Sequence, residues 1–380
     1  MKHLSILAGL LLTVGALAME PNAELEQAIW NTSVGNTLYI GKLTTQHNFM
    51  NFTVKDSGPR IVFSDNPEYL KDEGICCSET LGEETARVYL YNVNDSPTNH
   101  YKFAIILKNL TNKPGKVTIY RRAAIKPSQA YGRIGKVGLL DFYSKPYRKT
   151  VQIPAKGSAL LDDFWEKNPA ARQDLAHGFY EIYSHQSTQI IMAGMVKTKN
   201  TLKTYSQLTL LPPNNRNAGR GIFVTSDRYV KTSPIDTKNG IQRLRMADGQ
   251  IDKWVKGYDS SVNVKTENIG NYGVLYTVEV PYTSSDNRLM AVVVMSQPAG
   301  ADYCSYGGVV GTKAENNLTK EGYYLTPADQ YHLVEATKGC LVGLYQAQPK
   351  GGTIQFEFSP PGSSCLPADF FFIPVNSLNK

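Results

Sequence analysis

The sequence predicts an all-β protein made of two antiparallel β-sandwich domains in tandem, of jelly-roll or immunoglobulin-like type, with one or two short helices. Short runs of β-branched and aromatic residues are separated by turns rich in Gly, Pro and Asn. The chain has 380 residues, with 23 Tyr, 31 Gly and 20 Pro. This length is too great for a single β core and suits two domains of about 150 residues each.

The first eighteen residues are expected to form a secretory signal peptide. A short basic start leads into an apolar run, which ends in Ala16-Leu17-Ala18 before Met19. A membrane anchor is the alternative, but it would need about 20 apolar residues. We therefore expect a secreted protein, extracellular or in the cell envelope, that does not span a membrane after cleavage.

The first domain is expected at residues 85–212, after an acidic N-terminal segment at residues 19–84. Its predicted strands lie within residues 87–95, 101–125, 150–161 and 178–196. The run 101–125 is interpreted as a hairpin with the turn TNKPG, and the run 150–161 as a sheet edge because Pro154 and Gly157 interrupt it. One short helix is expected near residues 132–145. A second is expected at residues 159–168, with Ser158 as its candidate N-cap.

The second domain is expected at residues 222–380, after a linker at residues 213–221. The surrounding stretch LLPPNNRNAGRG has two Pro, three Asn and two Gly in twelve residues. Beyond it the strand pattern resumes. The runs VLYTVEVPY and RLMAVVV flank the polar turn TSSDN and are interpreted as a hairpin.

Charge is distributed unevenly along the chain. Residues 20–86 hold 11 acidic residues against 4 Lys and Arg, a net charge of −7, whereas residues 87–149 hold 13 Lys and Arg against Asp95 and Asp141, a net charge of +11. The two segments could neutralise each other within one domain, or the second could present a basic, Tyr-rich face to an anionic partner. The candidate anion-binding residues are Arg121, Arg122, Lys126, Arg133 and Lys136.

Five cysteines leave at least one thiol unpaired within the chain. Cys76 and Cys77 are adjacent, lie among acidic residues and are expected in an exposed loop. Cys340 is expected in a buried strand. Cys304 and Cys365 lie in turn-like sequence and form the candidate disulfide.

The sequence contains no pattern typical of a catalytic or metal site. Its histidines do not form a zinc motif, and no Ser lies in a nucleophile elbow. The glycines Gly132, Gly135 and Gly138 do not match a phosphate-binding loop and are expected to allow close packing of a helix. Asp248, Asp252 and Asp259 lack the spacing of a calcium loop. No signature of specific nucleic-acid binding is present. Catalytic residues, cofactor-binding residues and metal ligands are therefore not assigned.

The runs described above, together with IQFEFSPPGSSCLPADFFFIPV near the C-terminus, resemble a family of uncharacterised secreted bacterial proteins with two β domains. Some of its members are joined to copper-amine-oxidase-like repeats thought to bind cell walls, and the chain is also similar to a cyanobacterial family of unknown function. The resemblance covers most of residues 85–376. It implies the compartment and the fold, and it carries over no site residue.

These features favour a secreted, non-enzymatic binding or structural protein of the cell envelope or extracellular space. Its expected partner is an envelope polymer or a protein that meets the basic face. The alternative is a carbohydrate-active protein, either a lectin-like module or a glycoside hydrolase with carboxylates from distant strands.

Overall fold

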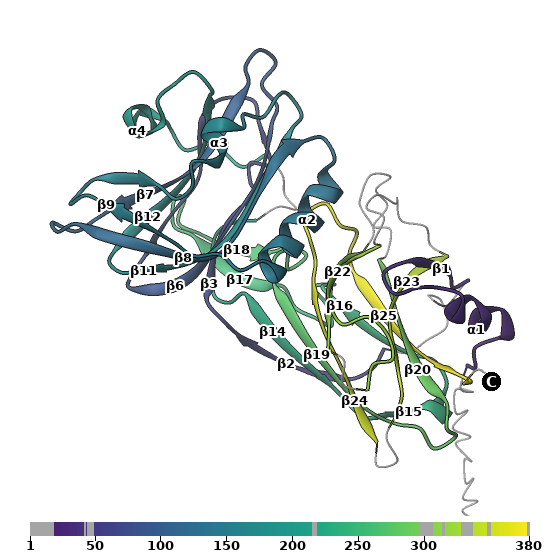
Figure 1. Cartoon of the computed structure of the whole chain (residues 1–380). Coiled ribbons are helices and arrows are strands. Elements are labelled where there is room, and N and C mark those ends of the chain that lie inside the picture. Colours follow the sequence, from purple (N-terminus) through teal and green to yellow (C-terminus); the bar gives the residue numbers. More distant parts are fainter. Residues whose placement is uncertain are drawn as a thin grey trace, which may run out of the picture.

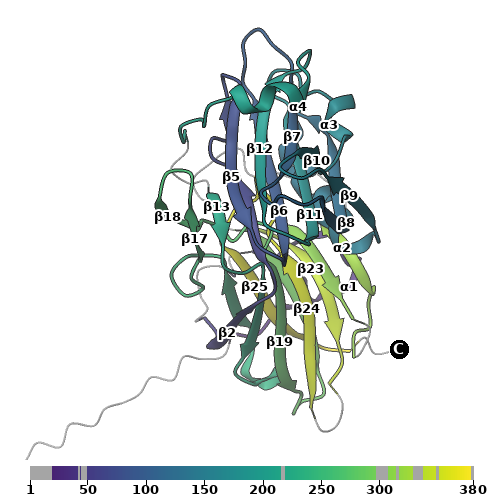
Figure 2. The ribbon, with the colours of Figure 1, turned by 90° about the vertical axis from the view of Figure 1, so that its left-hand side faces the viewer.

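The described part of the chain is mostly β-structure, as the sequence predicts. The computed structural model describes residues 19–41, 43, 49–214, 219–296, 307–313, 316–327, 337–347 and 351–377. These residues form two sandwiches that lie end to end (Figures 1 and 2). The predicted signal peptide lies outside the described residues.

The first sandwich pairs a nine-stranded sheet with a four-stranded sheet. The nine-stranded sheet has the order β18-β17-β13-β3-β6-β11-β8-β9, with β4 also beside β6. Its strands are β3 (Arg60–Ser64), β4 (Tyr69–Leu70), β6 (Glu84–Asn94), β8 (Gly115–Ser128), β9 (Lys149–Ile153), β11 (Leu175–Ser184), β13 (Arg220–Phe223), β17 (Val255–Asp259) and β18 (Val264–Asn268). The four-stranded sheet consists of β10 (Ser158–Leu160), β7 (Tyr101–Asn109), β12 (Thr188–Val196) and β5 (Gly74–Leu81), in that order.

The second sandwich pairs a seven-stranded sheet with a five-stranded sheet. The seven-stranded sheet consists, in order, of β2 (Phe52–Ser57), β14 (Asp227–Thr232), β19 (Leu275–Thr283), β24 (Gly352–Ser359), β21 (Gly308–Thr312) and β22 (Gly322–Thr326), with β15 (Ile235–Asp236) also beside β19. The five-stranded sheet consists of β1 (Thr37–Tyr39), β23 (Lys338–Tyr345), β20 (Leu289–Ser296), β25 (Ala368–Val375) and β16 (Gln242–Met246).

Most strand pairs are antiparallel, but β3 and β4 pair with β6, and β14 and β15 pair with β19, in parallel. The helices are short: α1 (Ala23–Trp30), α2 (Tyr131–Ser144), α3 (Phe164–Lys167), α4 (Thr201–Thr204), and the 3₁₀ turns η2 (Tyr205–Gln207) and η3 (Thr237–Asn239). The predicted helix at 132–145 is confirmed as α2. The predicted helix at 159–168 is shorter than expected, because Ser158 begins β10 and only Phe164–Lys167 is helical.

Both predicted hairpins are wrong. β7 lies in the four-stranded sheet and β8 in the nine-stranded sheet, so the turn TNKPG crosses between the two layers. The turn TSSDN likewise connects β19 in the seven-stranded sheet to β20 in the five-stranded sheet. An alternating pattern identifies a strand with one buried face, but it does not show whether the next strand pairs beside it or packs in the opposite layer about 10 Å away.

The sheets do not divide at the predicted linker. β13, β17 and β18 follow residue 215 in the sequence but belong to the nine-stranded sheet, where β13 pairs with β3. Conversely, β1 and β2 come from the N-terminal segment and pair with β23 and β14 of the second sandwich. Each sandwich is therefore assembled from both halves of the chain.

Helix α2 joins the two sandwiches. It covers the outer face of β8 and β11 and also contacts β22 (Figure 1). The Phe142 ring stacks on Phe179 of β11 with centroids 3.9 Å apart, and Tyr143 lies nearly parallel to Tyr323 of β22 at 5.7 Å. Buried aromatic residues of the first sandwich thus continue into the core of the second.

A buried ion pair crosses the same junction. Arg87 on β6 is almost fully buried and contacts the Asp227 carboxylate of β14 at 2.6 Å and the Glu181 carboxylate of β11 at 3.1 Å. A buried guanidinium needs such partners because an unpaired charge is costly to remove from water. These ion pairs therefore fix the position of β14 relative to β6 and β11 at a contact that is otherwise apolar.

The glycines of α2 allow the helix to approach its neighbours closely, as the sequence predicts. A β-carbon at Gly138 would lie 2.3 Å from Cδ2 and 2.4 Å from Nε2 of His177 on β11. One at Gly135 would lie 2.6 Å from the Gly362 carbonyl oxygen. Any larger side chain at these two positions would push α2 away from the sheet or from the loop at Gly362.

We expect Gly138→Ala to lower the free energy of unfolding by about 1–3 kcal/mol, because fully buried His177 cannot move aside. Urea denaturation followed by circular dichroism measures the change. Gly82→Ala is the matched control, since the nearest atom to its β-carbon would be 3.8 Å away. Equal losses in the two variants would contradict close packing of α2.

His177 should make stability depend on pH. Burial lowers its pKa to about 4 in the folded protein, while its pKa in the unfolded chain is about 6.5. The unfolded state therefore takes up a proton first as pH falls. The contribution of His177 to stability is therefore complete above pH 6.5, and about 3 kcal/mol of it should be lost between pH 6.5 and 4.

The comparison variant is His177→Asn, whose amide can still donate to the Leu90 carbonyl that lies 3.1 Å from His177 Nδ1. The unfolding free energy of this variant should depend less on pH over the same interval than that of the wild type. The same dependence in both proteins would assign it to other groups.

Candidate functional site

The five predicted anion-binding residues do not form one face. Arg122 is directed into the first sandwich, where its Nε lies 2.6 Å from the Asp162 carboxylate, which also accepts a hydrogen bond from Tyr180 at 2.9 Å. Arg121 lies on the outer face, 4.0 Å from Glu181 and with its guanidinium 5.8 Å from the centre of the Phe142 ring. The Arg122 guanidinium is thus held in an internal ion pair, whereas the Arg121 side chain stays 42% exposed.

The other three residues differ in exposure. Lys136 is fully buried on α2, so it cannot reach a polymer at the surface and is wrong as a candidate. Lys126 and Arg133 are exposed, and within the described ranges neither makes an ion pair. Lys136 was predicted to be exposed because it is charged. Positions along α2 alternate between the packed face and the solvent with a period of 3.6 residues, so the charge alone does not show which face a residue occupies.

A basic and aromatic strip lies elsewhere on the same segment. It occupies the outer face of the nine-stranded sheet, on the part that α2 leaves uncovered (Figure 1). We define the basic-aromatic strip as Lys116, Thr118 and Tyr120 of β8, Arg148 and Thr150 at β9, and Tyr183 and His185 at the end of β11.

Strand register brings these side chains together. Thr118 pairs with Thr150 on β9 and with Tyr183 on β11, so all three project from the same face. The Thr118 hydroxyl lies 3.1 Å from His185 Nε2, and the Tyr183 and His185 rings meet edge to face at 4.7 Å. A bulge in β8 between the pairs Glu181–Arg121 and Ile182–Ile119 adds Tyr120 as an extra residue.

Cations border these rings. The Arg148 guanidinium lies 5.5 Å from the centre of the Tyr120 ring, and Lys116 follows the alternation of β8 on the same face. Of the carboxylates in the described part of the chain, only that of Glu83 is hydrogen-bonded to the strip, through the Tyr183 hydroxyl at 3.2 Å. The strip is therefore a positively charged surface with aromatic rings between its cations.

A hollow of about 430 Å³ opens at one end of the strip. Its lining is basic and amide-bearing: Thr111, Lys113, Pro114, Gly115, Lys116, Gln152, His185 and Gln186. The Gln186 side chain is fixed there, because its amide oxygen accepts from the Lys116 backbone N–H at 2.9 Å. Since the lining holds no carboxylate, it suits an anionic group.

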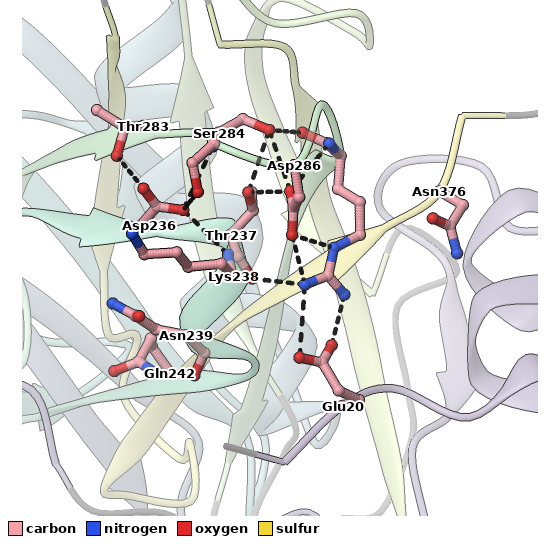
Figure 3. Close-up of polar contacts among 12 residues, drawn as sticks. Glu20, Asp236, Thr237, Lys238, Asn239, Gln242, Thr283, Ser284, Asp286 and Asn376 are labelled. Carbon is pink, nitrogen blue, oxygen red and sulfur yellow. Dashed lines mark hydrogen bonds and ion pairs between the residues drawn. The ribbon is translucent and has the colours of Figure 1, made fainter. Parts of the chain in front are cut away.

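A second polar cluster lies at the turn between β19 and β20 (Figure 3). Arg288 contacts the Asp286 carboxylate at 2.8 Å, pairs with Glu20 and donates to the Thr237 carbonyl at 2.8 Å. Asp236 accepts from the Thr283 hydroxyl at 2.8 Å, and its hydrogen bonds lower its pKa to about 2. These groups satisfy one another and fasten the segment before α1 to the second sandwich, so we assign the cluster a structural role.

The thiols of Cys76, Cys77 and Cys340, in the described part of the chain, are all buried in strands. Cys76 and Cys77 lie in β5 and are fully buried, so the predicted exposed loop is wrong. Burial raises the pKa of Cys76 to about 12, which keeps the thiol protonated. Cys340 is buried in β23, as expected. Cys365 is disulfide-bonded, and its predicted partner Cys304 lies outside the described residues.

Metal ligands do not gather in the described parts of the chain, where no group of three His, Cys, Asp or Glu side chains is arranged to hold an ion. Asp252, considered above for calcium, is buried and 2.6 Å from the Arg228 guanidinium. Asp248 Oδ1 accepts three backbone N–H groups at 2.9 Å in a turn. Within the described residues, no helix is long and apolar enough to span a membrane.

The chain matches no protein-family model and no curated protein sequence. Among solved structures, the chain shows a weak similarity to an oxalate decarboxylase from Lactobacillus farciminis in complex with formate. The identity is 8%, the TM-score is 0.15, and the alignment covers 85% of this chain and 87% of that chain. This likeness is too low to inform either fold or function.

Proposed function

We propose that this chain is a secreted, non-enzymatic binding protein of the cell envelope or extracellular space, and that it contacts an anionic polymer through the basic-aromatic strip. The observation that carries the proposal is the charge of this surface. Lys116, Arg148 and the adjoining Lys113 make no ion pair with any described carboxylate, and the hollow beside them is lined by no carboxylate. Unneutralised cations at a protein surface attract polyanions and bind them in a salt-dependent way.

The shape of the strip also supports a polymer rather than a small ion. It runs across three strands and continues into the hollow beside Lys113, so several charges of one chain could be contacted at once. Tyr120 and Tyr183 add ring surface between the cations, which suits sugar rings or other flat groups of a polymer. The signal peptide expected at residues 1–18 is consistent with an envelope polymer as the partner.

The test is retention of residues 19–380 on isolated cell envelope and on immobilised heparin, a defined polyanion, across a salt series. We expect Lys116→Gln/Arg148→Gln to weaken binding about tenfold, because two exposed charge contacts of about 0.7 kcal/mol each are lost. Retention of the wild type should also fall steeply with salt.

The matched control is Lys126→Gln/Arg133→Gln, which removes the same charge from exposed positions outside the strip. It should bind nearly as well as the wild type. Equal weakening of the two double variants would show that net charge alone governs retention. Retention that changes neither with salt nor in either variant would contradict binding of an anionic polymer through the basic-aromatic strip.

A further inference from the structure

A second hollow lies on the other sandwich, on the outer face of the seven-stranded sheet. It is lined by Gly311, Thr312 and Lys313 of β21 and its end, Gly322 and Tyr323 of β22, and Gln355, Phe356 and Glu357 of β24. Its volume is about 260 Å³. None of these residues belongs to the basic-aromatic strip.

Strand register places three of these residues in one row across the sheet. Gly311 pairs with Tyr323 on one side and with Glu357 on the other. A β-carbon at Gly311 would lie 2.5 Å from Cε1 of Tyr323, so the absence of a side chain lets the ring lie across β21. The Tyr323 hydroxyl then donates to the Glu357 carboxylate.

The ring is held from a further direction. Tyr143 of α2 lies nearly parallel to it, with an angle of 19° between the planes. Tyr143 is almost fully buried and belongs to the core that joins the sandwiches. The position of Tyr323, and through it that of Glu357, is therefore fixed before any ligand binds, which lowers the entropic cost of binding.

The polar groups around the hollow suit hydroxyl groups. Tyr323 donates to only one Glu357 oxygen, Oε2, so the carboxylate retains sites for further donors. The half-exposed Gln355 amide can both donate and accept, and the exposed Lys313 ammonium can donate. A carboxylate, an amide and an ammonium beside an aromatic ring can bind the adjacent hydroxyl groups of a sugar.

Charge distinguishes this hollow from the one beside the strip. Glu357 would repel an acidic sugar, whereas the hollow lined by Lys113, Lys116 and His185 contains no carboxylate. We infer that the hollow formed by Lys313, Tyr323, Gln355 and Glu357 binds one residue of a neutral, hydroxyl-rich saccharide. This inference does not depend on polyanion binding by the strip.

The experiment is titration calorimetry of residues 19–380 with cellohexaose, xylohexaose and mannohexaose as neutral probes, and with hexagalacturonate as the acidic probe. We expect at least one neutral probe to bind, with an affinity that changes little between low and high salt. Glu357→Gln and Gln355→Ala should each weaken that binding about fivefold, the effect of losing one hydrogen bond worth about 1 kcal/mol.

Lys116→Gln/Arg148→Gln is the matched control and should leave neutral-saccharide binding unchanged. Near-ultraviolet circular dichroism verifies that each variant is folded. Lys313→Ala is a third variant of the hollow, at an exposed position where the substitution does not disturb the core. The inference is overturned if no neutral probe binds, if binding is unaffected by all three hollow variants, or if only hexagalacturonate binds. If no neutral saccharide binds but retention on heparin still depends on salt, only the saccharide inference is contradicted, and the proposal for the basic-aromatic strip is not.

Discussion

The close packing of α2 between the two sandwiches is the interaction on which the rest of the structure depends. Gly135 and Gly138 remove the side chains that would separate the helix from Gly362 and His177. Phe142 then reaches Phe179 on one sandwich, and Tyr143 reaches Tyr323 on the other. Buried Arg87 crosses the same junction to Asp227. One short helix thus converts two assemblies of sheets into a continuous apolar core.

The same helix determines which surfaces remain available. It covers one part of the outer face of β8 and β11 and leaves the other part, which carries Tyr120, Tyr183 and His185, open to solvent. On the second sandwich, Tyr143 of α2 packs against Tyr323, which lines the hollow proposed to bind a neutral saccharide. The two proposed binding surfaces differ in charge, because one hollow contains Glu357 beside Lys313 and the other contains lysines and no carboxylate.

The sequence predicted local structure well and long-range pairing poorly. Alternating runs identified the strands, and the glycine spacing identified α2, because both features depend on neighbouring residues. The turns TNKPG and TSSDN were misassigned because a turn between layers has the same composition as a hairpin turn. The linker predicted at residues 213–221 did not anticipate that β13, β17 and β18 join the sheet of β3, a pairing that only the folded chain specifies.

The proposed basic-aromatic strip lies largely in the segment whose excess charge was visible in the sequence, but it consists of other residues than the five predicted from that segment. Excess charge between residues 87 and 149 was visible in the sequence. Which cations face the solvent depends on the bulge at Tyr120, on the inward direction of Arg122 and on the buried position of Lys136. Tyr183 and His185 lie outside that segment and are brought to it by the register of β11, for which the sequence carried no local signal.

The most direct test of the account is lysine acetylation of residues 19–380 with and without bound heparin, read by mass spectrometry. Bound polymer should shield Lys113 and Lys116, which border the uncovered part of the sheet, while exposed Lys126 and Lys238 stay reactive. Uniform shielding of all four lysines, or shielding confined to Lys126 and Lys238, would contradict recognition at the face that α2 leaves open.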